Sequence, residues 1–334
     1  MTALNPPIFS LLLLAAMMAL HGPASPVAAA GQSRGANAGD RDRDLKGAIY
    51  IHVHTIPDSE PWRVDSIEAA KLARARGMRG LVLKSHWEPT ATIAYLVRKE
   101  VPGIEVFGGI DLSRAVGGIN AAAVEQMTRI TGGFGKVVWM PTLDAENVVR
   151  ASGSNAPFVR ISLNQELLPE VKEVISVIAR HGLVLATGHS TAEEGLLLVR
   201  EGHRQGVQHM VVTHAMSRFP HMTIAQMQAA AREGAFIELV YVHTLTIPEL
   251  KRTANFTIPE AAEAIRQVGP ASIILSTDMG QVGIPLPIDG LAQFAAGLRA
   301  QGFSNGDLDR MMKENPARLL GLPALAREAA APAR

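Results

Sequence analysis

Short apolar runs alternate with longer amphipathic segments between residues 45 and 322. The short runs are continuously apolar, as expected for parallel strands that are buried on both faces. The longer segments repeat apolar residues at spacings of three and four, which predicts helices. The predicted strands span 47–54, 80–84, 104–110, 136–140, 183–187, 210–214, 235–241 and 272–277. The predicted helices span 64–76, 120–131, 167–181, 191–205, 223–233, 258–267, 288–301 and 305–320.

Eight strands that alternate with helices predict an α/β fold of the (β/α)8 or TIM barrel type. We expect one domain over residues 45–322, because the sequence contains no internal repeat and no sign of a second domain. The connection at 143–166 is longer and richer in Ser, Asn and Gly, which predicts a loop with a short extended piece at 157–162. In such a barrel, catalytic groups lie at the carboxyl ends of the strands.

The first 30 residues differ from the rest of the chain and predict a secretory signal peptide. An apolar stretch at Ile8–Leu20 is too short to span a membrane comfortably, and small residues follow it at Ala28–Ala30. Residues 1–30 contain no Lys or Arg, so a retained anchor or a misassigned start site are the alternatives. The polar, Gly-rich segment 31–44 predicts a disordered linker, and 323–334 a flexible tail. We therefore expect a secreted or periplasmic protein that is free of the membrane after cleavage.

The composition removes several classes of function. Cysteine is absent, which excludes disulfides, thiolate metal ligands and a Cys nucleophile. The net charge of +1, without basic runs, gives no case for binding nucleic acid or an anionic membrane surface. We therefore expect a small-molecule substrate as the partner, and formation of a homo-oligomer stays open. Any transition metal must be held by His, Asp, Glu or a modified Lys.

Residues that can bind metals follow the predicted strands. His52 and His54 end the first strand, and because side chains alternate along a strand, both imidazoles project from the same face. The carboxyl ends of the strands meet at one mouth of a barrel, so polar side chains at these ends would converge there. The other strand ends carry Lys84, His86, Asp111, His189, His214, Glu238 and Asp278.

These residue types favour hydrolytic metal chemistry. Imidazoles and carboxylates hold Zn²⁺, Mn²⁺ or Fe²⁺ while leaving a position for water, and the ion lowers the pKa of that water to about 7. Asp278 can bind the ion and take the proton from the water, while a second His can polarise the substrate or protonate the leaving group. Glu238 is either a site residue or a buried carboxylate paired with an Arg. His243 lies past the seventh strand and can reach the mouth through the following loop.

The order of these residues resembles the amidohydrolase superfamily of metal-dependent hydrolases. That pattern has an HxH motif after the first strand, a His after the fifth and sixth, and an Asp after the eighth. The resemblance spans residues 45–322, and it implies metal-binding roles for the matching residues, with Asp278 also the general base. The matching residues are His52, His54, His189, His214 and Asp278.

Four segments are more closely similar to an uncharacterised amidohydrolase-related family, DUF6282. They are HVHTIPD at 52–58, GLVLKSH at 80–86, GHS at 188–190 and DMGQ at 278–281. This resemblance implies a fold but no activity.

Two departures from the superfamily pattern leave the metal count open. Binuclear members often carry a carboxylated Lys at the end of the fourth strand, whereas here Lys136 begins that strand. Lys84 follows the second strand instead, where it can bridge two metals as a carbamate, bind a substrate anion or form a structural ion pair. Lys84 and His86 also lie where polymerase-and-histidinol-phosphatase (PHP) enzymes carry their second His motif. His86 can therefore be a ligand, a catalytic group or a support for another ligand.

The sequence thus predicts an exported metal-dependent hydrolase that acts on an amide, cyclic amide, lactone or ester bond. We expect one or two divalent ions, with zinc first and manganese or iron as alternatives. A PHP-type phosphoesterase and a non-catalytic periplasmic protein that binds a metal or ligand are the alternative functions, and a metal-dependent decarboxylase is a more distant one. The predicted metal ligands are His52, His54, Lys84, His189, His214 and Asp278, and the predicted catalytic groups are Asp278, His86 and Lys84.

Overall fold

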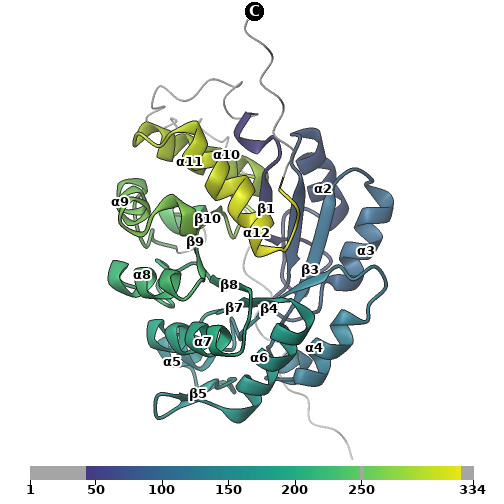
Figure 1. Cartoon of the computed structure of the whole chain (residues 1–334). Helices are drawn as coiled ribbons and strands as arrows, with labels where there is room; N and C mark the ends of the chain where they lie inside the picture. Colours follow the sequence, from purple (N-terminus) through teal and green to yellow (C-terminus); the bar gives the residue numbers. More distant parts are fainter. Residues whose placement is uncertain (1–42, 249–251, 325–334) are drawn as a thin grey trace, which may run out of the picture. The chain divides into compact units, whose positions relative to one another are not determined.

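The computed structural model of the chain describes residues 43–248 and 252–324 (Figure 1). The predicted signal peptide at 1–30 lies outside these residues, as do most of the predicted linker at 31–44 and most of the predicted tail at 323–334. Export therefore stays a prediction, which the N-terminal sequence of the mature protein would check.

The folded part of the chain includes the last two residues of the predicted linker. Asp44 is buried, and its carboxylate accepts hydrogen bonds from Arg299 at 2.6 Å and from Arg43 at 2.9 Å. Arg43 also pairs with Asp309 at 2.7 Å. Because Arg299 and Asp309 lie near the carboxyl end of the chain, these ion pairs join the two ends of the folded region.

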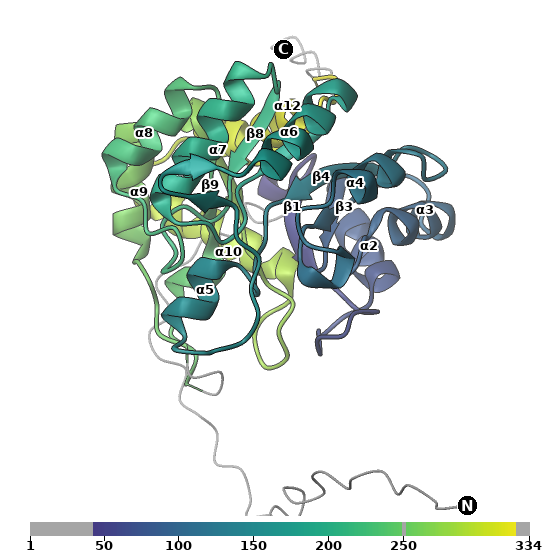
Figure 2. The same cartoon turned by 90° about the horizontal axis from the view of Figure 1, so that it is seen from below.

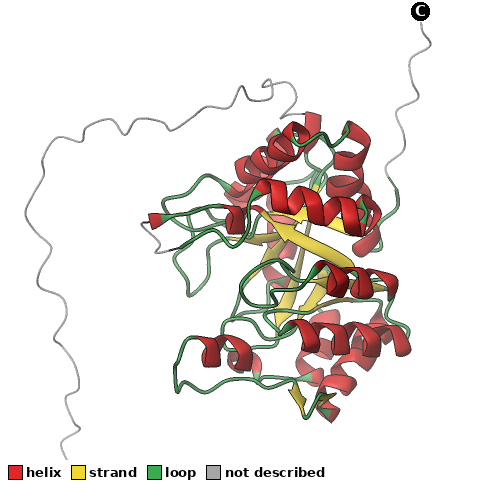
Figure 3. Ribbon diagram, turned by 90° about the vertical axis from the view of Figure 1, so that its left-hand side faces the viewer, coloured by secondary structure: helices red, strands yellow, loops and turns green. Residues whose placement is uncertain are grey.

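The central element is an eight-stranded parallel sheet, which confirms the predicted barrel. Its strands are arranged in the order β1-β2-β3-β4-β7-β8-β9-β10. At the open edge, Val53 of β1 forms a parallel bridge with Met279, three residues past the end of β10, and the His54 N–H donates to the Met279 carbonyl at 3.3 Å. This contact nearly closes the barrel, whose strands lie inside the ring of helices (Figure 3). The strands are β1 Ile49–His54, β2 Gly80–Lys84, β3 Glu105–Asp111, β4 Gly135–Trp139, β7 Val184–Ala186, β8 His209–Val212, β9 Phe236–Val240 and β10 Ile273–Ser276.

Helices cover the outer face of the sheet and connect successive strands (Figures 1 and 2). Several begin with a capping box, as Thr191 and Glu194 do at the start of α7, because free backbone N–H groups at a helix start need acceptors. No helix in the described ranges is long and apolar enough to cross a membrane. The helices are α2 Ser66–Ala75, α3 Ala91–Glu100, α4 Ala121–Thr128, α5 Glu146–Ala151, α6 Pro169–His181, α7 Ala192–Arg204, α8 Ile224–Arg232, α9 Ile258–Val268, α10 Pro287–Ala300, α11 Asn305–Asp309 and α12 Asn315–Leu319.

Helix α3 is missing from the sequence prediction. Its residues include the β-branched Thr92, Ile93 and Val97, which have low intrinsic helix propensity. The helix nevertheless buries Ala91, Ala94 and Val97 on one face. Packing of this face against the barrel therefore overrides the local preference.

The connection at 143–166 is more ordered than predicted. It contains helix α5 and a short antiparallel hairpin formed by β5 (Ser162–Leu163) and β6 (Glu166–Leu167). Of the expected extended piece at 157–162, Val159 forms a bridge with Ala145 and Ser162 begins β5.

The predicted last helix at 305–320 is interrupted by a π-helical turn at Arg310–Glu314. Pro316 follows this turn, and a proline cannot donate a backbone hydrogen bond to the preceding turn of a helix. The wider π turn accommodates this missing bond and divides the segment into α11 and α12.

Two apolar layers hold the fold together. The larger lies between the sheet and the helices, and the smaller fills the barrel interior with alternate strand residues such as Val137 and Trp139. Leu319 of helix α12 and the following Leu320 add to this inner layer. The Asn315 amide donates to the carbonyl of Ile273, the first residue of β10, at 2.7 Å. Helix α12 therefore closes the amino-terminal end of the barrel and leaves the carboxyl end for the site.

Gly109 allows β3 and β4 to approach closely, and Gly109→Ala is expected to destabilise the protein by about 3 kcal/mol. A methyl group at this position would lie 2.1 Å from the Val137 carbonyl oxygen and 2.5 Å from the Trp139 ring. Urea unfolding measures this loss in the free energy of unfolding. Gly306→Ala is the matched control, because its methyl group would lie 3.7 Å from the nearest atom, and we expect a change below about 1 kcal/mol. Equal unfolding midpoints for the two variants would contradict the packing argument.

Candidate metal centre

A bulge in β1 aims the two histidines of the HxH motif into the barrel. Ile51 belongs to the apolar interior, whereas Tyr50 packs against the outer layer. Strict alternation would therefore put His52 and His54 on the outer side with Tyr50. The pairing register with β2 shifts between Tyr50 and Val53, and Val53 packs outward. This irregularity reverses the alternation and turns both imidazoles inward.

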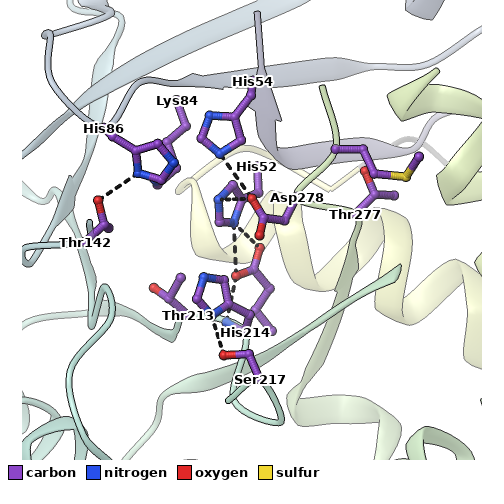
Figure 4. Close-up of polar contacts among 12 residues, drawn as sticks. His52, His54, Lys84, His86, Thr142, Thr213, His214, Ser217, Thr277 and Asp278 are labelled. Atoms are coloured by element: carbon purple, nitrogen blue, oxygen red, sulfur yellow. Dashed lines mark hydrogen bonds and ion pairs between the residues drawn. The ribbon is translucent and has the colours of Figure 1, made fainter. Parts of the chain in front are cut away.

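Asp278 follows β10 and faces both of these histidines (Figure 4). Its Oδ1 lies 3.1 Å from His54 Nε2 and 3.2 Å from His52 Nε2. Donor atoms around a tetrahedral zinc ion, with bonds of about 2.0–2.1 Å, lie about 3.4 Å from one another. The three side chains therefore have the spacing of a ligand set. The backbone of Asp278 has a φ of 51°, a strained conformation that is common at functional sites.

Glu238, in the centre of β9, orients the histidines. Its Oε1 accepts a hydrogen bond from His52 Nδ1 at 3.0 Å, and its Oε2 accepts the backbone N–H of His214 at 3.0 Å. Burial alone would raise the pKa of the Glu238 carboxyl, but the contacts with His52 and His214 hold it below its usual value. Because Nδ1 of His52 carries the proton, its Nε2 keeps the lone pair that a metal needs. Among the described residues, the side-chain partners of Glu238 are thus His52 and the backbone of His214, and no Arg pairs with it.

A second pair of imidazoles approaches Asp278 from the other side. His214 follows β8, and its Nδ1 lies 3.0 Å from the Ser217 hydroxyl. His243 lies in the 3-10 turn Tyr241–Thr244 after β9, with its Nε2 3.7 Å from Asp278 Oδ2. The possible ligand atoms of this group, one from each residue, all lie within 4.8 Å of one another, and the residues are His214, His243 and Asp278.

The buried imidazoles fit a divalent ion. Burial lowers the pKa of His54 and of His214 to about 4, so both rings are neutral at pH 7 and can donate a lone pair. A buried polar atom without a partner costs about 1–3 kcal/mol, which an ion would remove. Within the described part of the chain, the ring nitrogens without a hydrogen-bond partner are Nε2 of His52, His214 and His243 and Nδ1 of His54 and His189. The Nε2 of His54 instead contacts Asp278.

His86 belongs to a hydrogen-bonded chain beside the histidine cluster. Its ring stacks on His54 with the centroids 4.7 Å apart. The Thr142 hydroxyl donates to the Asp111 carboxylate, and the Thr142 oxygen lies 2.8 Å from His86 Nδ1. Because the hydroxyl hydrogen is used on Asp111, the oxygen accepts the Nδ1–H of His86. The Nε2 of His86 then carries a free lone pair.

The Lys84 amine is fully buried next to this chain. Its Nζ lies 3.7 Å from Asp111 Oδ2 and 3.1 Å from His86 Nδ1. Burial lowers the pKa of Lys84 and raises the pKa of Asp111 to about 8, so both groups shift toward their neutral forms. Asp111 is thus a buried partner of Lys84, in a contact where burial disfavours the charge on both groups. Its roles as a metal bridge, a catalytic group or a substrate contact stay predictions.

His189 lies at the mouth of the barrel next to His214, with ring centroids 4.8 Å apart. Its ring also stacks on Phe219 at 4.3 Å with nearly parallel planes. His189 is absent from the two three-residue ligand groups found among the described residues, which contain His52, His54 and Asp278, or His214, His243 and Asp278. The role of His189 as a ligand stays a prediction.

Sequence reasoning gave no role to Thr142 and only an indirect one to His243. Each lies two residues beyond a predicted strand end, at 140 and at 241. His86 has the same spacing from Lys84, the predicted end of the second strand. A search for polar residues two positions past each strand end would therefore have found both.

Comparisons with known proteins agree with this fold. The sequence profile of DUF6282, a family of unknown function, matches residues 47–238. A search of curated proteins gave no significant match.

Many solved structures have a similar fold. An amidohydrolase from Pseudomonas aeruginosa is 15% identical with a TM-score of 0.57, over 84% of this chain and 98% of that protein. An organophosphorus hydrolase from Deinococcus radiodurans is 16% identical with a TM-score of 0.56, over 82% and 92%. A 2,6-dihydroxybenzoate decarboxylase from Rhizobium is 14% identical with a TM-score of 0.51, over 83% and 99%. At these identities the likeness shows the fold alone.

Proposed function

The chain belongs to the DUF6282 family, and we propose that it is a metal-dependent hydrolase that cleaves an amide, cyclic amide, lactone or ester bond with water. One observation carries the proposal: His52, His54 and Asp278 converge with ligand spacing at the carboxyl end of the barrel. The likeness to an amidohydrolase and an organophosphorus hydrolase supports the choice of an enzyme over a structural protein.

A divalent ion at this point would be held by His52, His54 and Asp278. Three nitrogen and oxygen ligands with an open position are typical of catalytic zinc, so zinc is the first ion to test, and manganese and iron accept the same donors. When bound, such an ion supplies Lewis acidity and lowers the pKa of water to about 7.

Asp278 is placed to accept the proton of the attacking water. Burial alone would raise the pKa of its carboxyl, but the surrounding histidines hold the pKa well below the usual range, so the group is ionised. Its Oδ1 faces His52 and His54, which leaves lone pairs on Oδ2 to accept a proton.

His86 is placed to deliver a proton to the leaving group. Thr142 and Asp111 hold its Nδ1–H, so Nε2 is the atom through which the ring exchanges a proton. Burial and the neighbouring Lys84 hold the pKa of His86 well below its usual value, so the ring is neutral at rest and readily releases a proton that it receives during the reaction. Support of an imidazole through its other nitrogen is the arrangement that general acid–base histidines use.

A cavity of about 510 Å³ is lined by neighbours of the site residues in the sequence, and we propose that it takes the non-reacting part of the substrate. Trp87 and Leu143 line it, and they directly follow His86 and Thr142 in the sequence. Its wall also contains the buried carboxylate of Asp144, whose Oδ1 has no hydrogen-bond partner among the residues described here. A small molecule with an apolar portion and a hydrogen-bond donor would fit these surroundings.

Removal of the metal tests the proposed function. We expect a chelator to lower hydrolysis of a lactone, amide or ester by at least about 100-fold, because the ion activates the water. Addition of Zn²⁺, Mn²⁺ or Fe²⁺ to the dialysed protein should restore it. Release of acid or p-nitrophenol is the measurement.

The same panel separates the alternatives. Restored protein that cleaves only p-nitrophenyl phosphate or phosphodiesters would favour the PHP-type phosphoesterase. Metal binding without turnover of any substrate, including release of CO2 from aromatic acids, would favour a carrier. Protein that binds none of the three metals would refute the metal site.

A further inference from the structure

We propose that Trp62 binds the substrate by donating its indole N–H to the oxygen of the acyl group that is cleaved. The inference rests on the proposed function, because an amide, cyclic amide, lactone and ester all carry this oxygen, as a carbonyl before hydrolysis and in a carboxylate after it. Trp62 lies in the connection between β1 and α2, and neither the metal centre nor the proposed proton transfers use it.

The Trp62 ring lies against the two histidines that are proposed to act on the substrate. It stacks on His54 with the ring centroids 4.5 Å apart and the planes inclined by 26°. Its centroid lies 6.2 Å from that of His86, and the two histidine rings stack on each other (Figure 4). Because His54 is a proposed metal ligand and His86 the proposed proton donor, a substrate that both groups reach would lie next to Trp62.

The indole N–H of Trp62 is buried and has no hydrogen-bond partner among the described residues. A buried Trp usually finds an acceptor, and a donor without one costs about 1–3 kcal/mol. Trp87 follows the rule, because its indole N–H donates to Glu60 at 3.2 Å. Trp62 as a whole is partly exposed, so a ligand from solvent can reach its ring. Since an indole nitrogen only donates, the group that satisfies it must be an acceptor, such as a carbonyl or carboxylate oxygen.

The loop after β10 holds the backbone of Trp62 in place. Trp62 forms an antiparallel bridge with Gln281, and the N–H of Arg63 donates to the Gly280 carbonyl at 2.7 Å. Gly280 and Gln281 lie two and three residues after Asp278, so these contacts tie Trp62 to the segment that positions a proposed ligand. A donor that is already held in place loses little conformational freedom when it binds a ligand.

A fixed donor at this position would favour the reaction as well as binding. The acyl oxygen gains negative charge when water adds to the neighbouring carbon. A hydrogen bond to this oxygen therefore strengthens as the reaction proceeds, and it stabilises the transition state more than the bound substrate. Trp62 would serve this role through Nε1, while its ring stays stacked on His54.

NMR of the tryptophan indoles tests the proposal without turnover. The chain contains three Trp residues, so the ¹⁵N-labelled protein should give three indole N–H signals, and the one missing from Trp62→Phe belongs to Trp62. Benzoate is the probe, because hydrolysis of every proposed bond class leaves a carboxylate. In the zinc-loaded full chain, we expect benzoate to move the Trp62 signal downfield, as formation of a hydrogen bond does. Trp62→Phe should bind benzoate about 10-fold more weakly, because one hydrogen bond is lost.

Trp62→Phe also separates substrate binding from packing, because phenylalanine keeps an aromatic ring against His54 and removes only the donor. Its zinc affinity should match that of the wild type, whereas kcat for p-nitrophenyl acetate should fall by about 10²-fold, as on loss of one donor to a developing oxyanion. Tyr95→Phe is the matched control, since it removes a donor from an aromatic ring on the outer helix α3. We expect it to change neither quantity.

The outcomes distinguish the inference from the proposed function. A Trp62 signal that stays in place at every benzoate concentration would overturn the inference and leave metal-dependent hydrolysis to the chelator test. Equal losses of zinc affinity and turnover in Trp62→Phe would assign the ring to the support of His54, which also overturns the inference. A chain that binds no metal would overturn both.

Discussion

Asp278→Asn is expected to lower the hydrolytic rate by about 10³- to 10⁴-fold while the barrel stays folded. The substitution keeps a similar shape and one oxygen, but it removes the negative charge that faces His52 and His54. It also removes the proton acceptor, and loss of a positioned general base costs about 10²- to 10⁴-fold in rate. The added loss of a metal ligand places the expected effect at the upper end of this range.

Saturating metal distinguishes the two contributions of Asp278. Turnover that stays low at high Zn²⁺, with the proposed site filled, would identify the proton acceptor, whereas full recovery would show that Asp278 acts as a ligand alone. A carrier protein would bind metal in both forms and show no turnover in either. Asp65→Asn makes the same chemical change at the N-cap of α2, where Asn is an equally good cap, and should leave rate and stability unchanged.

The barrel could be predicted because its signal is repeated along the chain. Eight apolar runs end at or near polar residues, and the structure places all eight strands in one parallel sheet. The resemblance to the amidohydrolase superfamily rested on the order of these polar residues along the chain. The barrel topology brings them together, because the carboxyl ends of all strands meet at one end of the barrel. Helix α3 was not predicted, because its packing and not the helix propensity of its residues determines its structure.

Details within the site depend on irregular backbone that sequence patterns do not encode. Alternation predicts that His52 and His54 share a face, but only the register shift in β1 decides that this face is the inner one. His243 reaches the centre because a 3-10 turn follows β9, and such a turn leaves no periodic signal. Thr142 gains its role from Asp111, which ends β3, and from His86, which follows β2, and both are distant from it in sequence.

His52→Ala is expected to weaken metal binding at the proposed site by more than about 100-fold, with a matching loss of turnover at limiting metal. The variant removes one ligand, and it also leaves the buried Glu238 carboxylate without its imidazole partner. A buried acceptor that loses its hydrogen-bond donor costs about 1–3 kcal/mol, and more when it is charged, so His52→Ala should also unfold at lower temperature.

His52→Gln separates these two effects, because its amide can still donate to Glu238 while it lacks the imidazole lone pair. We expect His52→Gln to recover part of the stability but not the metal affinity. Glu238→Gln should lower the zinc affinity less than His52→Ala does, since loss of a carboxylate that supports a ligand costs about 10- to 100-fold in affinity. Competition with a fluorescent zinc chelator measures the zinc affinity of all three variants, and His203→Ala, at an exposed position of α7, is the surface control. Unchanged zinc affinity in His52→Ala would refute the proposed site, because His52 is one of its three ligands.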